Sequence, residues 1–424
     1  MNLERIFGIS ADYYLSKVKD LGQRCRRVIR DLKVVPLEPA GTPKGRLLLS
    51  YQLEPFVTDA RTAGPDHPVN WHSNNWETGE IANSFLEMGY GVDAIAWLNR
   101  AFVPRRRYDV AIDIRYNLQR WSTILGPACL KIFHIDTCHT LYRNASEARR
   151  LLDLQQRRGV SLQVRRFEYP NFGIEHCDCA TVIGNELTMS TYAYAHKPMF
   201  PVNVSSMVSM DWPADKDFDG VRNNFLWLGS MGMVTKGLDL VLEAFASLPD
   251  HHLTVCGPVE QEWDFTRAYH RELHETPNIH LEGWTDVRSR RFEELVRNSI
   301  GLVFPTCSEG QAGSVINCLS AGLIPIVSPQ AGVNVDDFGL LLPGCTVDEI
   351  RAAVIRVSSL PAAALRSMSR AAWTRALENH SRDAWKANYR RVIRQILDMH
   401  ARGEFHAASA ASGATAAPQF ETSL

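Results

Sequence analysis

Short apolar runs alternate with helix-forming segments along most of this chain, and that alternation limits its fold more than any other feature. In the first half the apolar runs lie at 46–53, 92–97, 108–114, 130–135 and 179–184. In the second half they lie at 224–228, 252–256, 278–281, 301–304 and 324–328. Strands that alternate with helices build parallel sheets covered by helices, so we predict an α/β fold.

A polar stretch at 211–224, which is rich in Asp, separates the two series. We therefore predict two Rossmann-like, doubly wound domains at 46–210 and 211–380, facing a cleft between them. The chain length of 424 residues suits two domains of this size.

Segments outside these domains have their own patterns. Helical spacing from about Ala11 to Val35 predicts amphipathic helices, which a linker from Pro36 to Gly45 follows, giving an N-terminal extension at 1–45. The same spacing predicts a C-terminal helix at 381–402, and the Ala/Ser/Gly-rich tail at 403–424 is predicted to be disordered. The basic N-terminal helix can either pack on the first domain or touch an anionic membrane surface.

Composition excludes several classes of protein. The net charge of -1 argues against nucleic-acid binding, which usually needs a basic excess. Nine cysteines and an opening without a secretory signal predict reduced thiols in a cytoplasmic protein. Cys177 and Cys179 have no second pair at ligand spacing, so we predict packing and no metal. The longest nearly apolar stretch, at 315–327, is too short to span a bilayer.

The segment from Pro305 to Ser328 carries the sharpest chemical signal. A strand ends at Phe304, small residues make a turn, and a helix begins near Gly313 and Ser314 with unpaired amides that can hold an anion. The pattern resembles the donor-binding signature of the retaining glycosyltransferase family four (glycosyl transferases group 1), which has the GT-B fold. The residues that match in register are Glu309, Gly310, Gly322 and Pro325.

The resemblance implies roles for this segment. Glu309 would contact the hydroxyls of the donor sugar, with Gly310, Gln311, Gly313 and Ser314 beside it. Asn317 stands where the family has a second Glu that binds the nucleotide ribose, so it could hydrogen-bond the ribose only through a neutral amide. The alternative is that Glu309 caps the helix and Asn317 faces solvent.

A glycine loop with Gly229 and Gly232 ends in Lys236 before the first helix of the second series. It resembles the family's loop, in which the lysine contacts the donor diphosphate. The family usually has an Arg just after the first glycine, but Ser230 and Met231 stand here. Neutralisation of the diphosphate would therefore rely on Lys236 and the helix amides. The loop is neither a P-loop nor a dinucleotide fingerprint.

Further residues are candidates by the same resemblance. Gly257 ends a strand, and Gly283 and Trp284 follow the strand whose loop usually meets the nucleobase, although Trp284 could also be a core aromatic. The family places a His after the fourth strand, and position favours His139 over His134, which lies inside the strand. Acceptor-side candidates are Asn74, Asn75, Glu77 and His134, with Asn75 alternatively capping a helix at 76–88.

The resemblance implies a retaining, hexosyltransferase-like enzyme that moves a sugar from a nucleotide-sugar donor to a glycan, lipid-linked or other hydroxyl. Its catalytic candidates are His139, Glu309 and Lys236. The nucleotide sugar is a substrate, and no cofactor or metal is expected. Family members commonly serve cell-envelope polysaccharide synthesis in the cytoplasm, some at the inner face of the membrane. The alternative is a non-catalytic GT-B protein that binds a sugar nucleotide or a partner, motivated by Asn317 and the missing Arg.

Overall fold

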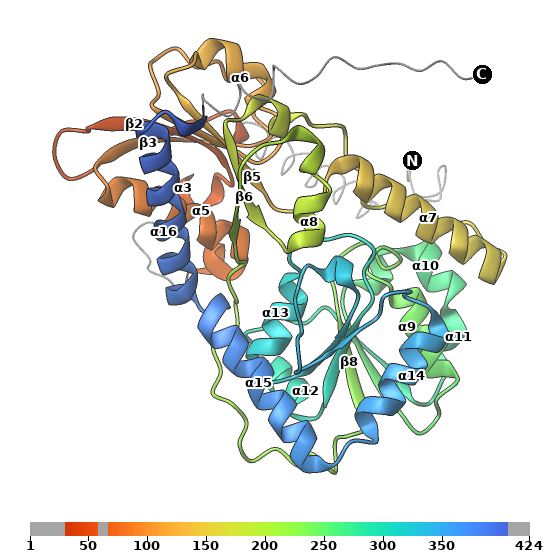
Figure 1. The fold of residues 1–424 in the computed structure, drawn as a ribbon. Helices are drawn as coiled ribbons and strands as arrows, with labels where there is room; N and C mark the ends of the chain where they lie inside the picture. The colour runs from red at the N-terminus through yellow and green to blue at the C-terminus, as the bar shows by residue number, and fades with distance from the viewer. Residues whose placement is uncertain (1–29, 58–66, 406–424) are drawn as a thin grey trace, which may run out of the picture. The chain divides into compact units, whose positions relative to one another are not determined.

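The protein is described by a computed structural model that covers residues 30–57 and 67–405 (Figure 1). The helices predicted up to residue 29 and the disordered tail predicted beyond residue 405 lie outside the described residues. The chain divides into two compact units, residues 1–132 and 133–424. The predicted boundary between the domains lies at residue 211, in the polar stretch at 211–224. The division into compact units falls earlier in the chain, and the predicted domains at 46–210 and 211–380 stay a prediction.

The first unit contains a mainly parallel sheet in the order β1-β3-β2-β4. Strand β2 pairs in parallel with both β3 and β4, and β1 pairs antiparallel with β3. The three leucines of β2, Leu47, Leu48 and Leu49, have no exposed surface, as expected for a central strand covered on both faces. The elements are β1 (Val34–Leu37), β2 (Gly45–Tyr51), α3 (Glu54–Val57), α5 (Ser73–Glu87), β3 (Tyr90–Ala96), β4 (Val110–Asp113) and α6 (Leu118–Leu125).

Strand β1 was not predicted, because the linker was expected to begin at Pro36. Pro36 instead lies within β1, opposite Asp93 of β3. Proline is tolerated there because β1 is at the edge of the sheet and needs no second ladder of hydrogen bonds. Strand β5 (Leu130–Ile135) contains the boundary between the two units.

The second unit contains a six-stranded parallel sheet in the order β10-β9-β8-β11-β12-β13. Helices α9 and α14 pack together on one face, and α13 and α15 pack together on the other (Figure 1). The strands are β8 (Asn224–Leu228), β9 (His252–Cys256), β10 (Ile279–Gly283), β11 (Gly301–Phe304), β12 (Ile324–Val327) and β13 (Leu340–Leu341). The helices are α9 (Leu238–Ala246), α10 (Trp263–Ala268), α11 (His270–His274), α12 (Arg290–Arg297), α13 (Gly313–Ser320), α14 (Val347–Ser358) and α15 (Ala362–His380).

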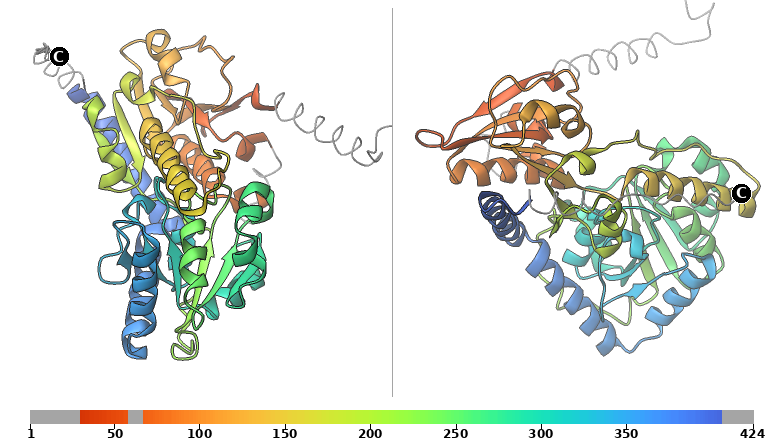
Figure 2. Two further views of the ribbon diagram at one scale, coloured as in Figure 1. Left: turned by 90° about the vertical axis from the view of Figure 1, so that its right-hand side faces the viewer. Right: turned by 45° about the horizontal axis from the view of Figure 1, so that its top comes forward.

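The second unit also holds elements that precede this sheet in the chain. They are α7 (Thr140–Arg158), β6 (Cys179–Ile183), α8 (Glu186–Ser190) and β7 (Met199–Val202), and the C-terminal helix α16 (Arg382–Ala401) follows the sheet. Strands β6 and β7 pair in parallel. Figure 2 shows α7 as a long helix continued by an extended segment at 160–172. The prediction of an α/β fold with two Rossmann-like sheets is confirmed.

Among the described residues, none of the helices combines the length and the apolar character needed to cross a bilayer. Cys177 and Cys179 are both buried, and burial raises the pKa of the Cys177 thiol to about 12.

Candidate functional site

Two loops meet at the carboxyl edge of the second sheet. Strands β8 and β11 are parallel neighbours, so the loops after them, at 229–237 and 305–312, leave the sheet at the same edge. The main chain joins the loops: Cys307 N donates to Thr235 O (2.9 Å), and Thr306 Oγ1 donates to the same oxygen (3.1 Å). A Cβ at Gly237, whose φ is 73°, would clash with the carbonyl oxygen of Pro305. The close approach of the loops therefore requires glycine at 237.

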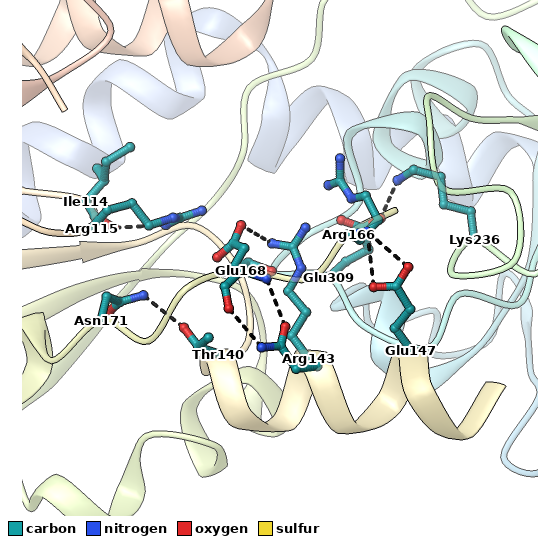
Figure 3. Close-up of polar contacts among 12 residues, drawn as sticks. Ile114, Arg115, Thr140, Arg143, Glu147, Arg166, Glu168, Asn171, Lys236 and Glu309 are labelled. Carbon is teal, nitrogen blue, oxygen red and sulfur yellow. Dashed lines mark hydrogen bonds and ion pairs between the residues drawn. The ribbon is translucent and has the colours of Figure 1, made fainter. Parts of the chain in front are cut away.

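Lys236 and Glu309, both predicted from the motifs, form an ion pair between these loops (Figure 3). Lys236 Nζ lies 2.5 Å from Glu309 Oε1, and the two side chains are 7% and 16% exposed. Glu309 does not cap the helix that follows, because the N-cap position is Ala312. The structure thus gives both residues a place in one small polar centre.

Each partner of this ion pair shifts the pKa of the other in the direction that favours the charged form. Burial lowers the pKa of Lys236, and the negative charge of Glu309 opposes that effect. Burial alone would raise the pKa of Glu309, but the charges of Lys236 and Arg166 and the hydrogen bond from Lys236 outweigh it, so its pKa is lowered. A carboxylate held ionised beside a buried ammonium can accept hydrogen bonds from sugar hydroxyls.

The start of α13 is open to a ligand. The N-cap residue Ala312 has no side chain that could bond to the first-turn amides, and a helix leaves these amides without partners inside itself. A Cβ placed on Gly313 would have no atom within 4 Å. Gly313 and Ser314 are both partly exposed. An anion can therefore approach this helix end, where the helix dipole favours negative charge.

Gly310 lies against the carboxyl ends of β5 and β6. A Cβ at this position would clash with the carbonyl oxygens of Asp136 and Ile183. The main chain of Glu309 is held from the same side, because Cys138 donates to Glu309 O through its N–H (3.3 Å) and its thiol (2.9 Å). The segment predicted to bind the donor is therefore fixed against the strand ends that precede His139.

His139 lies immediately after this contact, at the N-cap of α7. Its Nδ1 accepts from Leu141 N (3.3 Å), and its Nε2 lies 3.2 Å from the hydroxyl of Tyr194. Tyr194 in turn donates to Glu175 Oε1 (2.9 Å). Burial lowers the pKa of His139, although Glu175 opposes the shift, so the imidazole is mainly neutral at pH 7.

His134 is an unsuitable acceptor-side residue in this structure. It has no exposed surface, its Nδ1 lies 2.7 Å from Thr181 Oγ1, and its ring packs edge-on against Tyr389 of α16. A side chain in the middle of a strand points into the packing layer, and this is the role that its position in the sequence suggested for it.

Gln311 and Asn317 hold the chain at 204–207. Gln311 Oε1 accepts from Val204 N (2.7 Å). Asn317 Oδ1 accepts from Met207 N (2.9 Å) and Ser206 Oγ (3.2 Å). Asn317 is thus partly buried, and its side chain is used within the protein rather than left to solvent. Its oxygen, the atom best suited to accept from a ribose hydroxyl, is already engaged. No pattern within the motif itself points to this use.

The backbone geometry at the ends of β9 and β10 explains why glycine stands there. A Cβ at Gly257 would lie 2.6 Å from Gly229 O, so the ends of β8 and β9 approach closely only with glycine there. Gly283 ends β10 with a φ of 83° and open space around it. Trp284 is 71% exposed, so the interpretation of this residue as a core aromatic is wrong.

The remaining acceptor-side candidates belong to the first unit. Helix α5 begins at Ser73, and His72 Nδ1 caps it by accepting from Asn74 N (3.2 Å), so the prediction of a cap at Asn75 is wrong. Asn75 lies inside the first turn and donates through Nδ2 to Val69 O (2.9 Å). Glu77 has no exposed surface.

Helix α7 contributes buried charged residues that the sequence analysis did not single out. Arg143, Glu147 and Arg150 are each less than 10% exposed. Arg143 Nη1 contacts Glu168 Oε1 (2.6 Å), and both terminal nitrogens of Arg150 donate to Pro305 O (3.1 Å). Figure 3 shows Arg143 and Arg166 pointing toward the Lys236–Glu309 pair. Arg150 and Arg166 belong to Arg-Arg pairs, but such pairs recur elsewhere in the chain, for example at 290–291 and 390–391, so the sequence gives no specific signal for this use.

No group of three or more His, Cys, Asp or Glu side chains is placed to hold a metal ion in the part of the chain that the structure describes. The groups that the structure places at this edge are the Lys236–Glu309 ion pair, the first amides of α13 and several arginines.

Comparison with solved structures shows that this is a GT-B fold. Sucrose-phosphate synthase from Thermosynechococcus elongatus superposes with a TM-score of 0.57 at 13% identity, over 84% of this chain and 100% of that one. A trehalose-6-phosphate synthase superposes with a TM-score of 0.51 at 10% identity, over 84% and 99%. TarM from S. aureus aligns at 12% identity with a TM-score of 0.47, over 67% of this chain and only 55% of the TarM chain.

Residues 222–359 match the sequence model of the family described as Glycosyl transferases group 1. The matched segment contains both motifs, around Lys236 and Glu309, on which the predicted resemblance to this family rests. A search of the curated proteins found no match.

Proposed function

We propose that this chain is a glycosyltransferase that moves a sugar from a nucleotide-sugar donor to an acceptor hydroxyl. The observation that carries the proposal is the Lys236–Glu309 ion pair beside the uncapped start of α13, in a domain that matches a glycosyltransferase family. A nucleotide sugar places a diphosphate directly beside a sugar ring. Adjacent cationic and anionic groups suit those two parts of the donor.

In the proposed reaction the bond between the sugar anomeric carbon and the diphosphate oxygen breaks, and a bond to the acceptor oxygen forms. The acceptor proton passes to the leaving diphosphate. Lys236 and the amides at Gly313 and Ser314 stabilise the negative charge that develops on the leaving group. Glu309 orients the sugar by accepting from its hydroxyls. Transfer with retention of configuration is part of the proposal, since the motif resembles that of a retaining family.

The acceptor is proposed to be a glycan or lipid-linked hydroxyl, and His139 would lie on that side of the donor. Both ring nitrogens of His139 are engaged, Nδ1 by Leu141 N and Nε2 by the Tyr194 hydroxyl, so an acceptor hydroxyl would bind by taking the place of Tyr194 at Nε2. We propose a nucleotide sugar as substrate without a metal or other cofactor. We further propose that the protein acts in the cytoplasm, with peripheral contact to a membrane.

A second candidate is a non-catalytic protein that binds a sugar nucleotide. Two departures from the family's signature motivate it: the oxygen of Asn317 is engaged within the protein, and Ser230 and Met231 stand where the family usually has an arginine.

The test is a thermal-shift screen of UDP-, GDP-, ADP- and dTDP-sugars followed by turnover with the best binder. A donor that binds the folded state raises the melting temperature. The expected result is one stabilising donor, release of its nucleoside diphosphate, and a product whose anomeric configuration matches the donor by NMR. Binding without any nucleotide release, with and without added acceptor sugars, supports the second candidate. An inverted product contradicts retention.

A further inference from the structure

Arg166 is held over the glycine loop by contacts of its own main chain. It lies in the extended segment at 160–172, and the carboxylate of Glu147 accepts its N–H at 3.0 and 3.1 Å and that of Arg165 at 2.8 Å. The side chain then passes across Gly232, where a Cβ would lie only 2.7 Å from Arg166 Cγ. Glycine at 232 leaves the room that Arg166 occupies.

The guanidinium of Arg166 has no hydrogen bond or ion pair with the protein among the described residues, whereas the cations around it do. Lys236 pairs with Glu309, and Arg143 pairs with Glu168. Arg165, the adjacent residue, pairs with Asp264. Arg166 is partly buried and near enough to the central pair for its charge to lower the pKa of both Lys236 and Glu309.

A buried donor next to it also lacks a protein partner. Arg143 is 5% exposed, and its Nε makes no hydrogen bond within the described part of the chain. The charges of Arg143 and Arg166 both lower the pKa of Glu309, so both guanidinium groups lie near that carboxylate, and Figure 3 draws the three side chains close together. Unsatisfied cationic donors that converge in this way are the arrangement expected of an anion site.

The glycine loop itself offers little to an anion. Glu262, which is 2% exposed, accepts from Gly232 N (2.5 Å) and Met233 N (3.3 Å). These two amides, which could otherwise donate to a phosphate, therefore already have an acceptor within the protein. The loop carries the uncharged Ser230 and Met231 after its first glycine, so Lys236 is its one cationic side chain.

We propose that Arg166, supplied by the segment after α7, binds the donor diphosphate together with Lys236 and replaces the arginine that the glycine loop lacks. This inference rests on the proposed function. A guanidinium presents parallel N–H groups that match two phosphate oxygens, and a lysine acts as a point charge. Lys236 and Arg166 approach from different segments, so each can meet one phosphate of a nucleoside diphosphate.

The experiment measures binding of UDP, GDP, ADP and dTDP, and of the corresponding nucleosides, by calorimetry. The proteins are wild type, Arg166→Ala, Arg166→Lys and Arg149→Ala, the last removing an exposed arginine of α7 as a matched control. The expected result is that Arg166→Ala weakens binding of the preferred diphosphate by about ten- to a hundredfold. Arg166→Lys recovers part of this loss, Arg149→Ala binds like wild type, and nucleoside binding is unchanged in all variants.

Three outcomes count against the inference in different ways. If Arg166→Ala binds the diphosphate as tightly as Arg149→Ala does, the inference is overturned and the proposed function stands. If Arg166→Ala loses affinity for the nucleoside by the same factor, Arg166 shapes the pocket and does not bind phosphate. If wild type binds none of the diphosphates, the proposed function fails and the inference fails with it. Circular dichroism of each variant establishes that the fold is retained.

Discussion

The loops after β8 and β11 begin from neighbouring parallel strands and lead into helices, yet they present different chemical groups. The loop at 229–237 uses its amides internally, on Glu262, and contributes the side chain of Lys236. The loop at 305–312 leads into an uncapped helix and contributes backbone amides together with Glu309. Equivalent positions in a doubly wound sheet can therefore divide the binding of one ligand between side-chain charge and main-chain dipoles.

The largest expected effect comes from removing the charge of the first loop. Lys236→Met should lower kcat/KM about 10²- to 10³-fold, because a preorganised group that meets charge on the leaving group is lost. Glu309→Gln should cost less, since an amide oxygen still accepts from sugar hydroxyls. Steady-state release of nucleoside diphosphate measures both. Turnover of Lys236→Met within threefold of wild type would refute the view that the first loop supplies the charge and the second loop the amides.

A stability comparison tests how tightly the end of the first loop and the start of α13 are packed. Gly237→Ala should lower the free energy of unfolding by about 2–4 kcal/mol, because the new Cβ meets Pro305 O and the residue has a φ of 73°. Gly313→Ala should change it by less than about 1 kcal/mol, since its Cβ enters open space at a helical position. Urea unfolding gives both values. Equal destabilisation by the two alanines would show that the end of the first loop and the start of α13 are constrained alike.

The smallest expected effect is a pH dependence of the free energy of unfolding. It arises from the hydrogen bonds that link His380 through Val204 to the second loop. His380 is 4% exposed, its Nδ1 donates to Val204 O (2.9 Å), and Val204 N donates to Gln311 in that loop. Burial lowers the pKa of His380 to about 4. Between about pH 4 and 6.5 the unfolded chain therefore binds more protons at this residue than the folded one, and stability falls as the pH falls.

The contribution of His380 amounts to about 2 kcal/mol between pH 7 and pH 5. His380→Asn, which can still donate to Val204 O, should lose stability over that range by about 2 kcal/mol less than wild type. Urea unfolding at the two pH values is the measurement. Parallel pH profiles for wild type and variant would rule out a role for His380 in this pH dependence.

The strand and helix alternation and the two motif loops followed from the sequence. Strand β5 at 130–135 and helix α9 from Leu238 lie where apolar periodicity and small residues predict them. Such patterns are contiguous, so local chain geometry fixes them. The placement of Lys236 next to Glu309 followed in outline, because loops after neighbouring parallel strands share an edge. Helix α7 did not, since its buried stripe of Arg143, Glu147 and Arg150 is polar and gives no apolar period.

The sequence by itself thus determined the fold class and the segments that present Lys236 and Glu309. Only the tertiary structure decided how the surrounding charges are used. Glu262, 30 positions after Gly232 in the chain, accepts a hydrogen bond from the amide of this glycine. Arg166, which precedes Gly232 in the chain, packs its side chain against the same glycine. The state of a buried charge depends on partners that are distant in sequence, because in a medium of low dielectric only nearby opposite charges and hydrogen bonds offset the loss of water.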